Sequence, residues 1–253
     1  EIIEASDGLM VARGDLGIEV PYYDVPTIQK MLIKKANLKG IPVITATQML
    51  LSMTQNERAT RAEISDVANA VLDGTDVVML SEESAVGEDP INVVDTMHNI
   101  IAKTEGIYNY DKQYEMPYLD EFDVIQATVT KLADDLKANG ILAITSSGKS
   151  DLKMSRYRPR TPIFTFTHKK KVLNSLTAIW GVEPIGIIKE ARSRKMFQKM
   201  LVALDERGLL NKNGLYVATV GYPVGMPGST NTIKILTPSE IEYYLNFKDK
   251  KAK

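Results

Sequence analysis

The sequence GLMVARGDLG at residues 8–17 joins an apolar segment to a polar one, and the same join recurs twice further along the chain. Residues 8–12 are apolar, as are residues 42–46 and most of residues 76–80. Near-continuous apolar runs of this length are typical of parallel strands that are buried on both faces. Because an amphipathic segment follows each run, the alternation predicts a parallel sheet with helices over residues 8 to about 104.

The helix expected after the second strand has the clearest limits. Thr60 and Glu63 have the spacing of a capping box, in which each side chain binds the backbone amide of the other residue. Gly74 follows the helix, where a left-handed residue is favoured. The apolar residues between these limits recur at helical spacing and predict one buried stripe, formed by Ile64, Val67, Ala68, Val71 and Leu72.

A second domain is expected after a break in the pattern. Residues 107–120 show neither helical nor strand periodicity and are interpreted as a linker. The domains are therefore predicted at residues 1–106 and 121–253. The second domain begins with a helix and contains about five strands, at residues 141–145, 162–167, 182–188, 215–220 and 232–236.

The composition narrows the classes of partner. The 31 basic and 32 acidic residues give a formal net charge of -1, which favours neither nucleic acid nor a membrane surface as partner. No apolar run is long enough to span a bilayer. The chain contains no cysteine, which fits a reducing compartment, and the cytoplasm is the expected location. The chain begins with Glu1, and the native protein is expected to begin earlier.

Polar residues follow the three predicted strands at a regular spacing. Gly14 and Asp15 follow the first strand, Thr47 the second and Ser81 the third, 32 and 34 residues apart. Parallel strands end at one edge of their sheet, so these groups are expected to face one another. Gly14 allows a ligand to approach the backbone, Asp15 offers a hard oxygen to Mg²⁺, and the two hydroxyls suit proton transfer. Taken singly, however, each polar side chain is better explained as a helix cap.

A second polar loop follows the strand expected at residues 141–145. Its hydroxyls, glycine and backbone amides suit a phosphate group. The loop does not match a Walker A motif, because Ala143 occupies the position of the first glycine. A turn of small residues without a ligand explains the pattern equally well. The residues concerned are Thr145, Ser146, Ser147, Gly148, Lys149 and Ser150.

Four strings in the first domain resemble the pyruvate kinase family closely. They are MVARGDLG at residues 10–17, ATQML at 46–50, TRAEISDVANAV at 60–71 and LS at 80–81. The resemblance implies the C-terminal part of a (β/α)8 TIM barrel, followed by an α/β regulatory domain with a mostly parallel five-stranded sheet. It also implies transfer of a phosphoryl group from phosphoenolpyruvate to ADP, in glycolysis.

The resemblance assigns roles to the same residues. It implies that Asp15 holds Mg²⁺ or Mn²⁺, and that Gly14, Asp15 and Thr47 receive the substrate carboxylate. Thr47 and Ser81 would belong to the network that protonates the enolate. Arg61 would lie towards a subunit interface of a homotetramer. The loop at residues 145–150 would hold the phosphate of an allosteric effector with Lys149 as its charge partner, and residues 227–232 would face the same ligand.

The departures from the family limit what this chain does alone. The family's phosphoryl-binding lysine, its second metal-binding glutamate, its K⁺ ligands and its lid domain all lie upstream of the matched segment. Because electrostatic stabilisation dominates phosphoryl transfer, we predict that the chain alone is inactive. Glu82 and Ser84 stand where the family commonly has glycine and threonine. Two alternatives stay open. One is a stand-alone module that binds phosphorylated metabolites without catalysis. The other is another magnesium-dependent barrel enzyme acting on pyruvate or phosphoenolpyruvate, such as an aldolase, and the second domain argues against the aldolase.

Overall fold

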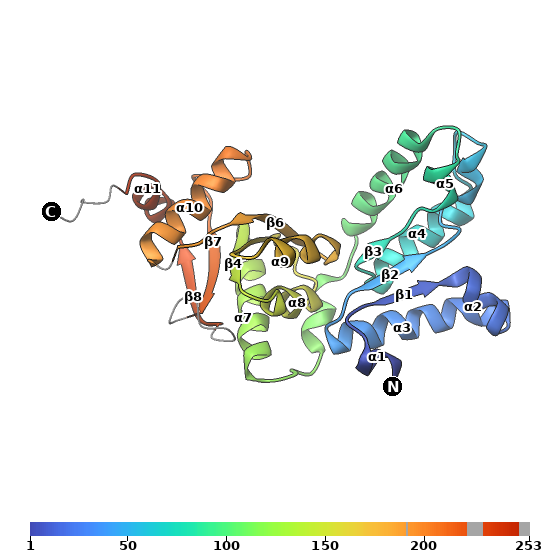
Figure 1. Cartoon of the computed structure of the whole chain (residues 1–253), viewed down its shortest axis with the longest axis horizontal. Helices are drawn as coiled ribbons and strands as arrows, with labels where there is room; N and C mark the ends of the chain where they lie inside the picture. Colours follow the sequence, from blue (N-terminus) through green and yellow to red (C-terminus); the bar gives the residue numbers. More distant parts are fainter. Residues whose placement is uncertain (191, 222–229, 248–253) are drawn as a thin grey trace. The chain divides into compact units, whose positions relative to one another are not determined.

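The computed structural model describes residues 1–190, 192–221 and 230–247. The chain divides into two compact units, Glu1–Lys112 and Gln113–Lys253 (Figure 1). The 3-10 helix η3 (Tyr110–Glu115) contains the point of division. Each unit has its own sheet and its own hydrophobic core.

The sheet of the first unit has three parallel strands in the order β1-β2-β3. They are β1 (Leu9–Ala12), β2 (Val43–Ala46) and β3 (Val77–Val78). The predicted parallel sheet is therefore confirmed. The third strand is shorter than the apolar run that predicted it, since pairing with β2 is limited to two positions, Ile44 with Val77 and Thr45 with Val78.

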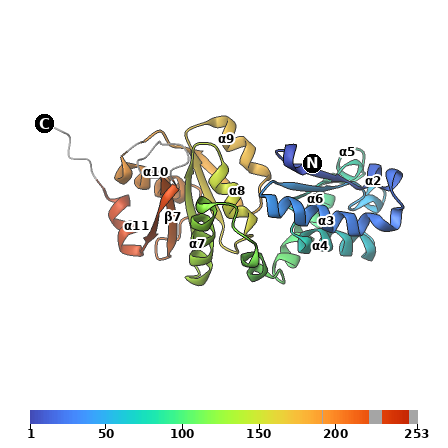
Figure 2. The ribbon, with the colours of Figure 1, turned by 90° about the horizontal axis from the view of Figure 1, so that it is seen from below.

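Helices α3, α4 and α6 form the other layer of the first unit (Figure 2). Helix α3 packs against β1 and β2, and α4 packs against both β3 and α6. The helical segments of the unit are α1 (Ile2–Ala5), α2 (Arg13–Glu19), η1 (Tyr22–Asp24), α3 (Val25–Lys39), η2 (Leu51–Thr54), α4 (Arg61–Asp73), α5 (Glu82–Ala85) and α6 (Pro90–Glu105).

Helix α4 begins and ends where the sequence predicts. Thr60 and Glu63 form the capping box, and Gly74 takes a left-handed conformation with φ of 90°. The predicted apolar stripe is only partly right, because Ile64 and Leu72, at its two margins, are 41% and 42% exposed. The face that packs in the core is narrower and includes Val67, Ala70 and Val71.

The second unit contains a five-stranded sheet in the order β6-β5-β4-β7-β8. Four strands are parallel and β8 pairs antiparallel to β7, which confirms the predicted, mostly parallel sheet. The strands are β4 (Gly140–Thr145), β5 (Ile163–Thr167), β6 (Val182–Ile187), β7 (Tyr216–Gly221) and β8 (Thr230–Leu236).

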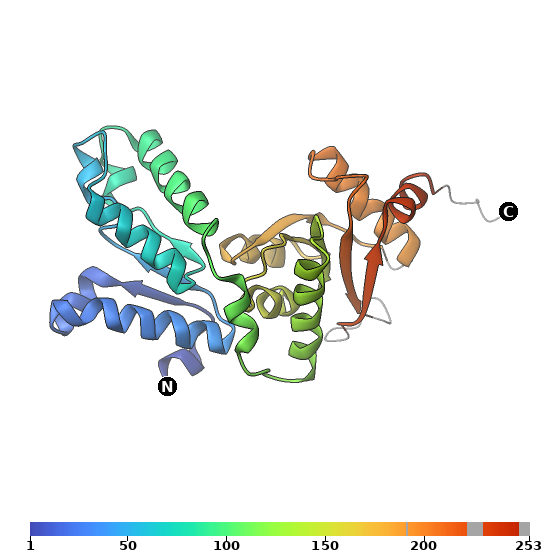
Figure 3. The ribbon, with the colours of Figure 1, turned by 180° about the vertical axis from the view of Figure 1, so that it is seen from behind.

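Two hydrophobic clusters place helices on opposite faces of this sheet (Figures 1 and 3). Helices α7 (Glu121–Asp135) and α8 (Lys149–Arg156) pack on one face, where the cluster includes Ile141 and Ala143 of β4. Helices α10 (Ser193–Glu206) and α11 (Pro238–Leu245) pack on the other, with Leu142. The remaining helical segments are α9 (Lys170–Ser175) and η4 (Leu176–Ala178).

Within the described parts of the chain, no helix has the length and apolar character needed to cross a bilayer.

Candidate functional site

The carboxyl edge of the first unit's sheet carries the four predicted site residues. Because β1, β2 and β3 are parallel, the segments that follow them leave the sheet at the same edge. Gly14 and Asp15 lie in α2, which begins directly after β1, and not in a polar loop. Thr47 directly follows β2. Ser81 was expected directly after the third strand, but β3 ends at Val78, so two residues separate Ser81 from the strand.

Asp15 is not the cap of its helix. The capping position of α2 is Ala12, and no side chain makes a capping hydrogen bond there. The carboxylate of Asp15 is exposed, on the border of a shallow hollow of about 350 Å³ that is also lined by Leu16, Ile18 and Glu19. An exposed carboxylate with no capping role is free to bind a cation or a polar ligand.

Thr47 contacts the start of α2 directly. The backbone N–H of Gly14 donates to Oγ1 of Thr47 at 3.0 Å, so a hydroxyl on one loop satisfies an otherwise unpaired amide of the neighbouring helix. The same hydroxyl donates to the carbonyl of Ala46 at 2.7 Å. Thr47 has φ of 69° and Gln48 has φ of 54°. Left-handed backbone is unusual for a β-branched residue and is often retained at functional sites.

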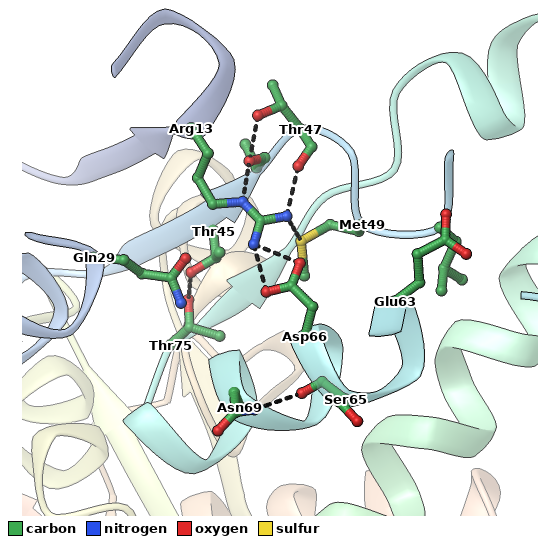
Figure 4. Close-up of polar contacts among 12 residues, drawn as sticks. Arg13, Gln29, Thr45, Thr47, Met49, Glu63, Ser65, Asp66, Asn69 and Thr75 are labelled. Atoms are coloured by element: carbon green, nitrogen blue, oxygen red, sulfur yellow. Dashed lines mark hydrogen bonds and ion pairs between the residues drawn. The ribbon is translucent and has the colours of Figure 1, made fainter. Parts of the chain in front are cut away.

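Arg13, for which no role was predicted, holds this turn in place. Its guanidinium donates to the carbonyls of Ala46 at 3.2 Å and Thr47 at 2.6 Å (Figure 4). It also donates to both carboxylate oxygens of Asp66 on α4, at 2.7 and 2.6 Å, and to Sδ of Met49 at 2.9 Å. One side chain therefore ties the end of β1 to the strained turn after β2 and to α4.

Glu83 performs the equivalent task for Ser81. The side chain of Glu83 is buried, and its carboxylate accepts from the backbone N–H of Ser81 at 2.8 Å and of Leu50 at 3.0 Å. Ser81 caps α5 by position but makes no side-chain capping bond. A Cβ on Gly87 would lie 2.2 Å from the carbonyl oxygen of Glu83, so this close packing requires glycine.

The structure thus brings Gly14 and Thr47 into contact and connects Ser81 to the segment after Thr47 through Glu83. Asp15 lies beside Gly14 in the first turn of α2. Arg61, expected near a subunit interface, is the exposed first residue of α4. Among the residues that the structure describes, no three acidic or histidine side chains form a group that would hold a metal ion without other ligands.

The second candidate loop begins at the carboxyl end of β4. Gly148 has φ of 83° and caps α8, and its N–H donates to Oγ1 of Thr145 at 2.9 Å. Ser150 donates to the same oxygen at 3.2 Å. Ser147 and Lys149 are exposed, whereas Ser146 is half-buried. Of the predicted return segment, residues 227–229 lie outside the described residues, and β8 begins at Thr230.

A buried carboxyl, Asp151, lies at the base of this loop. It accepts hydrogen bonds from the hydroxyls of Thr165, Thr145 and Ser150 and from its own backbone N–H. Burial raises the pKa of Asp151 to about 6, and these hydrogen bonds oppose part of that rise. Asp151 was not predicted as a site residue, since an aspartate in the first turn of a helix is ordinary.

Comparison with known families and structures gives consistent matches. Residues 1–94 match the model described as "Pyruvate kinase, barrel domain", and residues 123–236 match "Pyruvate kinase, alpha/beta domain". The chain is 46% identical over 249 residues to the pyruvate kinase of Geobacillus stearothermophilus, covering 95% of this chain and 42% of that protein. It is 45% identical over 238 residues to the enzyme of Clostridium acetobutylicum, covering 92% and 50%.

A solved structure agrees with these matches. A pyruvate kinase from Cryptosporidium parvum superposes with a TM-score of 0.86 at 36% identity, covering 93% of this chain and 48% of that one. The likeness confirms the predicted fold, a partial barrel followed by an α/β domain. The chain spans half or less of the length of each of these relatives.

Proposed function

The chain belongs to the pyruvate kinase family, and from that premise we propose that it forms part of an enzyme that makes pyruvate from phosphoenolpyruvate. In this reaction the P–O bond of phosphoenolpyruvate breaks, a β-phosphate oxygen of ADP takes the phosphoryl group, and the enolate is protonated on carbon. The contact between Gly14 and Thr47 beside the exposed carboxylate of Asp15 is the observation that carries the proposal.

The edge site suits the substrate carboxylate and the protonation step. Amides in the first turn of α2 and the hydroxyl of Thr47 would bind the carboxylate of phosphoenolpyruvate. Thr47 and Ser81 would orient the water that protonates the enolate. Arg13 and Glu83 are positioning residues, because each holds one of these hydroxyl-bearing segments through backbone contacts.

The residues of this chain could provide part of the ligand set of a divalent cation. Asp15 offers one exposed hard oxygen, and Mg²⁺ usually takes one or two protein carboxylates together with substrate oxygens and water. Asp15 would hold the Mg²⁺ or Mn²⁺, with further ligands from substrate and from residues that this chain does not contain. When bound, the ion supplies charge neutralisation for the phosphoryl oxygens.

The remaining assignments follow the family. We propose a regulatory role for the second unit, with a phosphorylated effector at residues 145–150 and Lys149 as its charge partner. We also propose a homotetramer with Arg61 near an interface, a glycolytic role in the cytoplasm, and K⁺ bound by residues absent from this chain. Nucleic acid and membranes are not among the proposed partners. None of the relatives named above is a stand-alone metabolite-binding module.

A chimera tests the proposal most directly. This chain would replace the matching 42% of the Geobacillus stearothermophilus enzyme, and pyruvate formation would be followed by coupled oxidation of NADH. An active chimera is expected, whereas the chain alone should give no turnover above background. Asp15→Asn in the chimera is expected to lower turnover by at least about a hundredfold, because a charged ligand is lost.

Asp7→Asn is the matched control. Asp7 is exposed and precedes β1, so it lies at the opposite end of the same strand from Asp15. The control should retain the chimera's activity. A folded chimera that turns over equally well with Asn at position 15 would refute the catalytic assignment.

A further inference from the structure

The carboxyl of Asp151 is buried without a cationic partner among the described residues. It lies in the first turn of α8, and its relative exposure is 0%. The basic residues further along α8 bind other carboxylates: Lys153 pairs with Asp120, and Arg156 pairs with Asp123. Its hydrogen bonds come from three hydroxyls and its own amide.

The elements packed around Asp151 supply no compensating charge. Helix α8 packs against α7, β4 and β5, and the two strands contain no ionisable residue. The buried acid of α7, Asp123, is engaged by Arg156 at 2.6 Å. At the ends of these elements, the lysines Lys149, Lys169, Lys170 and Lys171 are exposed, as is His168.

Hydrogen bonds connect this carboxyl to the backbone of the loop. Oγ of Ser150 lies 3.4 Å from Oδ2 of Asp151 and 3.2 Å from Oγ1 of Thr145, which in turn accepts from the N–H of Gly148 at 2.9 Å. On the sheet side, the hydroxyl of Thr165 on β5 donates to Oδ1. Asp151 therefore fastens the loop to β5.

The ionisation of Asp151 and the position of the loop must influence each other. Burial disfavours the charged form, and opening of the loop would let water reach the carboxyl and restore its ordinary pKa. The closed loop therefore holds the proton more tightly than the open loop does. By linkage, loss of the proton shifts the equilibrium towards opening.

We propose that Asp151 is a proton-operated latch on the loop of residues 145–150: the loop is closed while the carboxyl is protonated and opens to admit water as the carboxyl ionises. The latch would make the loop sensitive to pH near neutrality. The proposal concerns the loop itself and holds whether or not an effector binds there.

Hydrogen exchange and NMR on the whole chain test the latch. The carboxyl carbon of Asp151 reports its titration, and the protection factor of the Gly148 amide reports opening of the loop. With a closed-state pKa of about 6, the opening equilibrium in the wild type is expected to rise about tenfold between about pH 5 and about pH 7. In Asp151→Asn the protection factor should be independent of pH over this range.

Two further variants complete the test. Asp205→Asn removes a carboxylate that is paired with Lys212 on the surface, and it should leave the pH profile of Gly148 unchanged. Thr165→Val removes one hydrogen bond that favours the ionised form, so the midpoint of opening should move to higher pH. Equal profiles for the wild type and Asp151→Asn would overturn the proposal. If Asp151→Asn does not fold, an unmoved midpoint in Thr165→Val overturns it.

Discussion

The guanidinium of Arg13 donates to both carboxylate oxygens of Asp66, at 2.7 and 2.6 Å, and so fixes the end of β1 to α4. The Arg13 side chain is 13% exposed and that of Asp66 is 35% exposed. The same guanidinium holds the carbonyls of Ala46 and Thr47, which follow a different strand. A planar group with several fixed donors suits this task, whereas an ammonium group does not.

Arg13→Lys is expected to destabilise the first unit by about 2 to 4 kcal/mol. Lysine keeps the charge but loses the fork that binds Asp66 and the two carbonyls together, which leaves partly buried acceptors unpaired. Chemical denaturation followed by far-UV circular dichroism should show an earlier transition.

The tryptophan signal provides the internal control for this variant. Trp180 is the chain's single tryptophan and lies in the second unit. The unfolding transition reported by its fluorescence should therefore be the same in the variant and in the wild type. Identical circular dichroism curves for the wild type and Arg13→Lys would show that the fork contributes little.

Two substitutions of Thr47 distinguish its contribution to stability from its contribution to turnover. Thr47→Ser keeps the hydroxyl that accepts from Gly14 and removes the β-branch that strains left-handed backbone, so stability should stay equal or rise by up to about 1 kcal/mol. Thr47→Ala should cost no more than about 1 kcal/mol, because Gly14 is exposed and water can replace the hydroxyl.

Turnover in the chimera should distinguish the two Thr47 variants clearly. Serine is expected to stay within about threefold of the wild type, whereas alanine should lose at least about tenfold if the hydroxyl serves proton transfer. Equal turnover for serine and alanine would assign Thr47 to structure alone.

The parts of the fold that were predicted have strong local signals. The capping box at Thr60 and Glu63 and the left-handed Gly74 define the two ends of α4 by contacts between residues close in sequence. How many residues of the same helix are buried depends on the elements that pack against it. For this reason the prediction that Ile64 and Leu72 are buried was wrong. The short β3 likewise depends on its pairing with β2.

Helix α11 was missed although its signal is present in the sequence. Thr237 and Glu240 form a second capping box with Pro238 in the first turn, the same pattern that identified α4. The helix has only eight residues, which is too short for a clear helical periodicity.

The candidate site also has features that the sequence predicts and features that depend on contacts between distant residues. Spacing after parallel strands predicted where Gly14, Thr47 and Ser81 would lie, because topology alone determines that edge. The contacts of Arg13 depend on a partner 53 residues away, Asp66, and the buried environment of Asp151 depends on hydroxyls from two strands. Such pairings are not visible in the sequence of one element.

Lys149 is expected to determine anion affinity at the second loop. Inorganic sulfate stays fully charged across neutral pH and is a suitable probe, with the Gly148 amide as reporter in an NMR titration. Lys149→Ala should weaken binding by about tenfold, because the exposed lysine supplies the only side-chain cation within the loop itself. Lys212→Ala, an exposed lysine paired with Asp205, should bind as the wild type does. Sulfate that leaves Gly148 unperturbed at all concentrations would contradict the effector site but not the latch.

Asp151 should also make the stability of the second unit depend on pH in the direction opposite to most acids. Burial raises its pKa from 3.8 to about 6 in the folded state, so between these values the folded chain holds a proton that the unfolded chain has lost. The resulting stabilisation is fully present below about pH 4 and is lost as the pH rises through about 6. At roughly 1.4 kcal/mol for each unit of pKa, the change amounts to about 2 to 3 kcal/mol.

The comparison with Asp151→Asn isolates this contribution from that of the other acids. Urea unfolding followed by Trp180 fluorescence, at a series of pH values from about 4 to about 7, gives the free energy of unfolding for both proteins. The difference, wild type minus variant, should fall steadily towards neutral pH, because the asparagine side chain does not ionise. A difference that stays constant, or that grows with pH, would mean that the carboxyl is already hydrated in the folded chain, and the latch would then have no energetic basis.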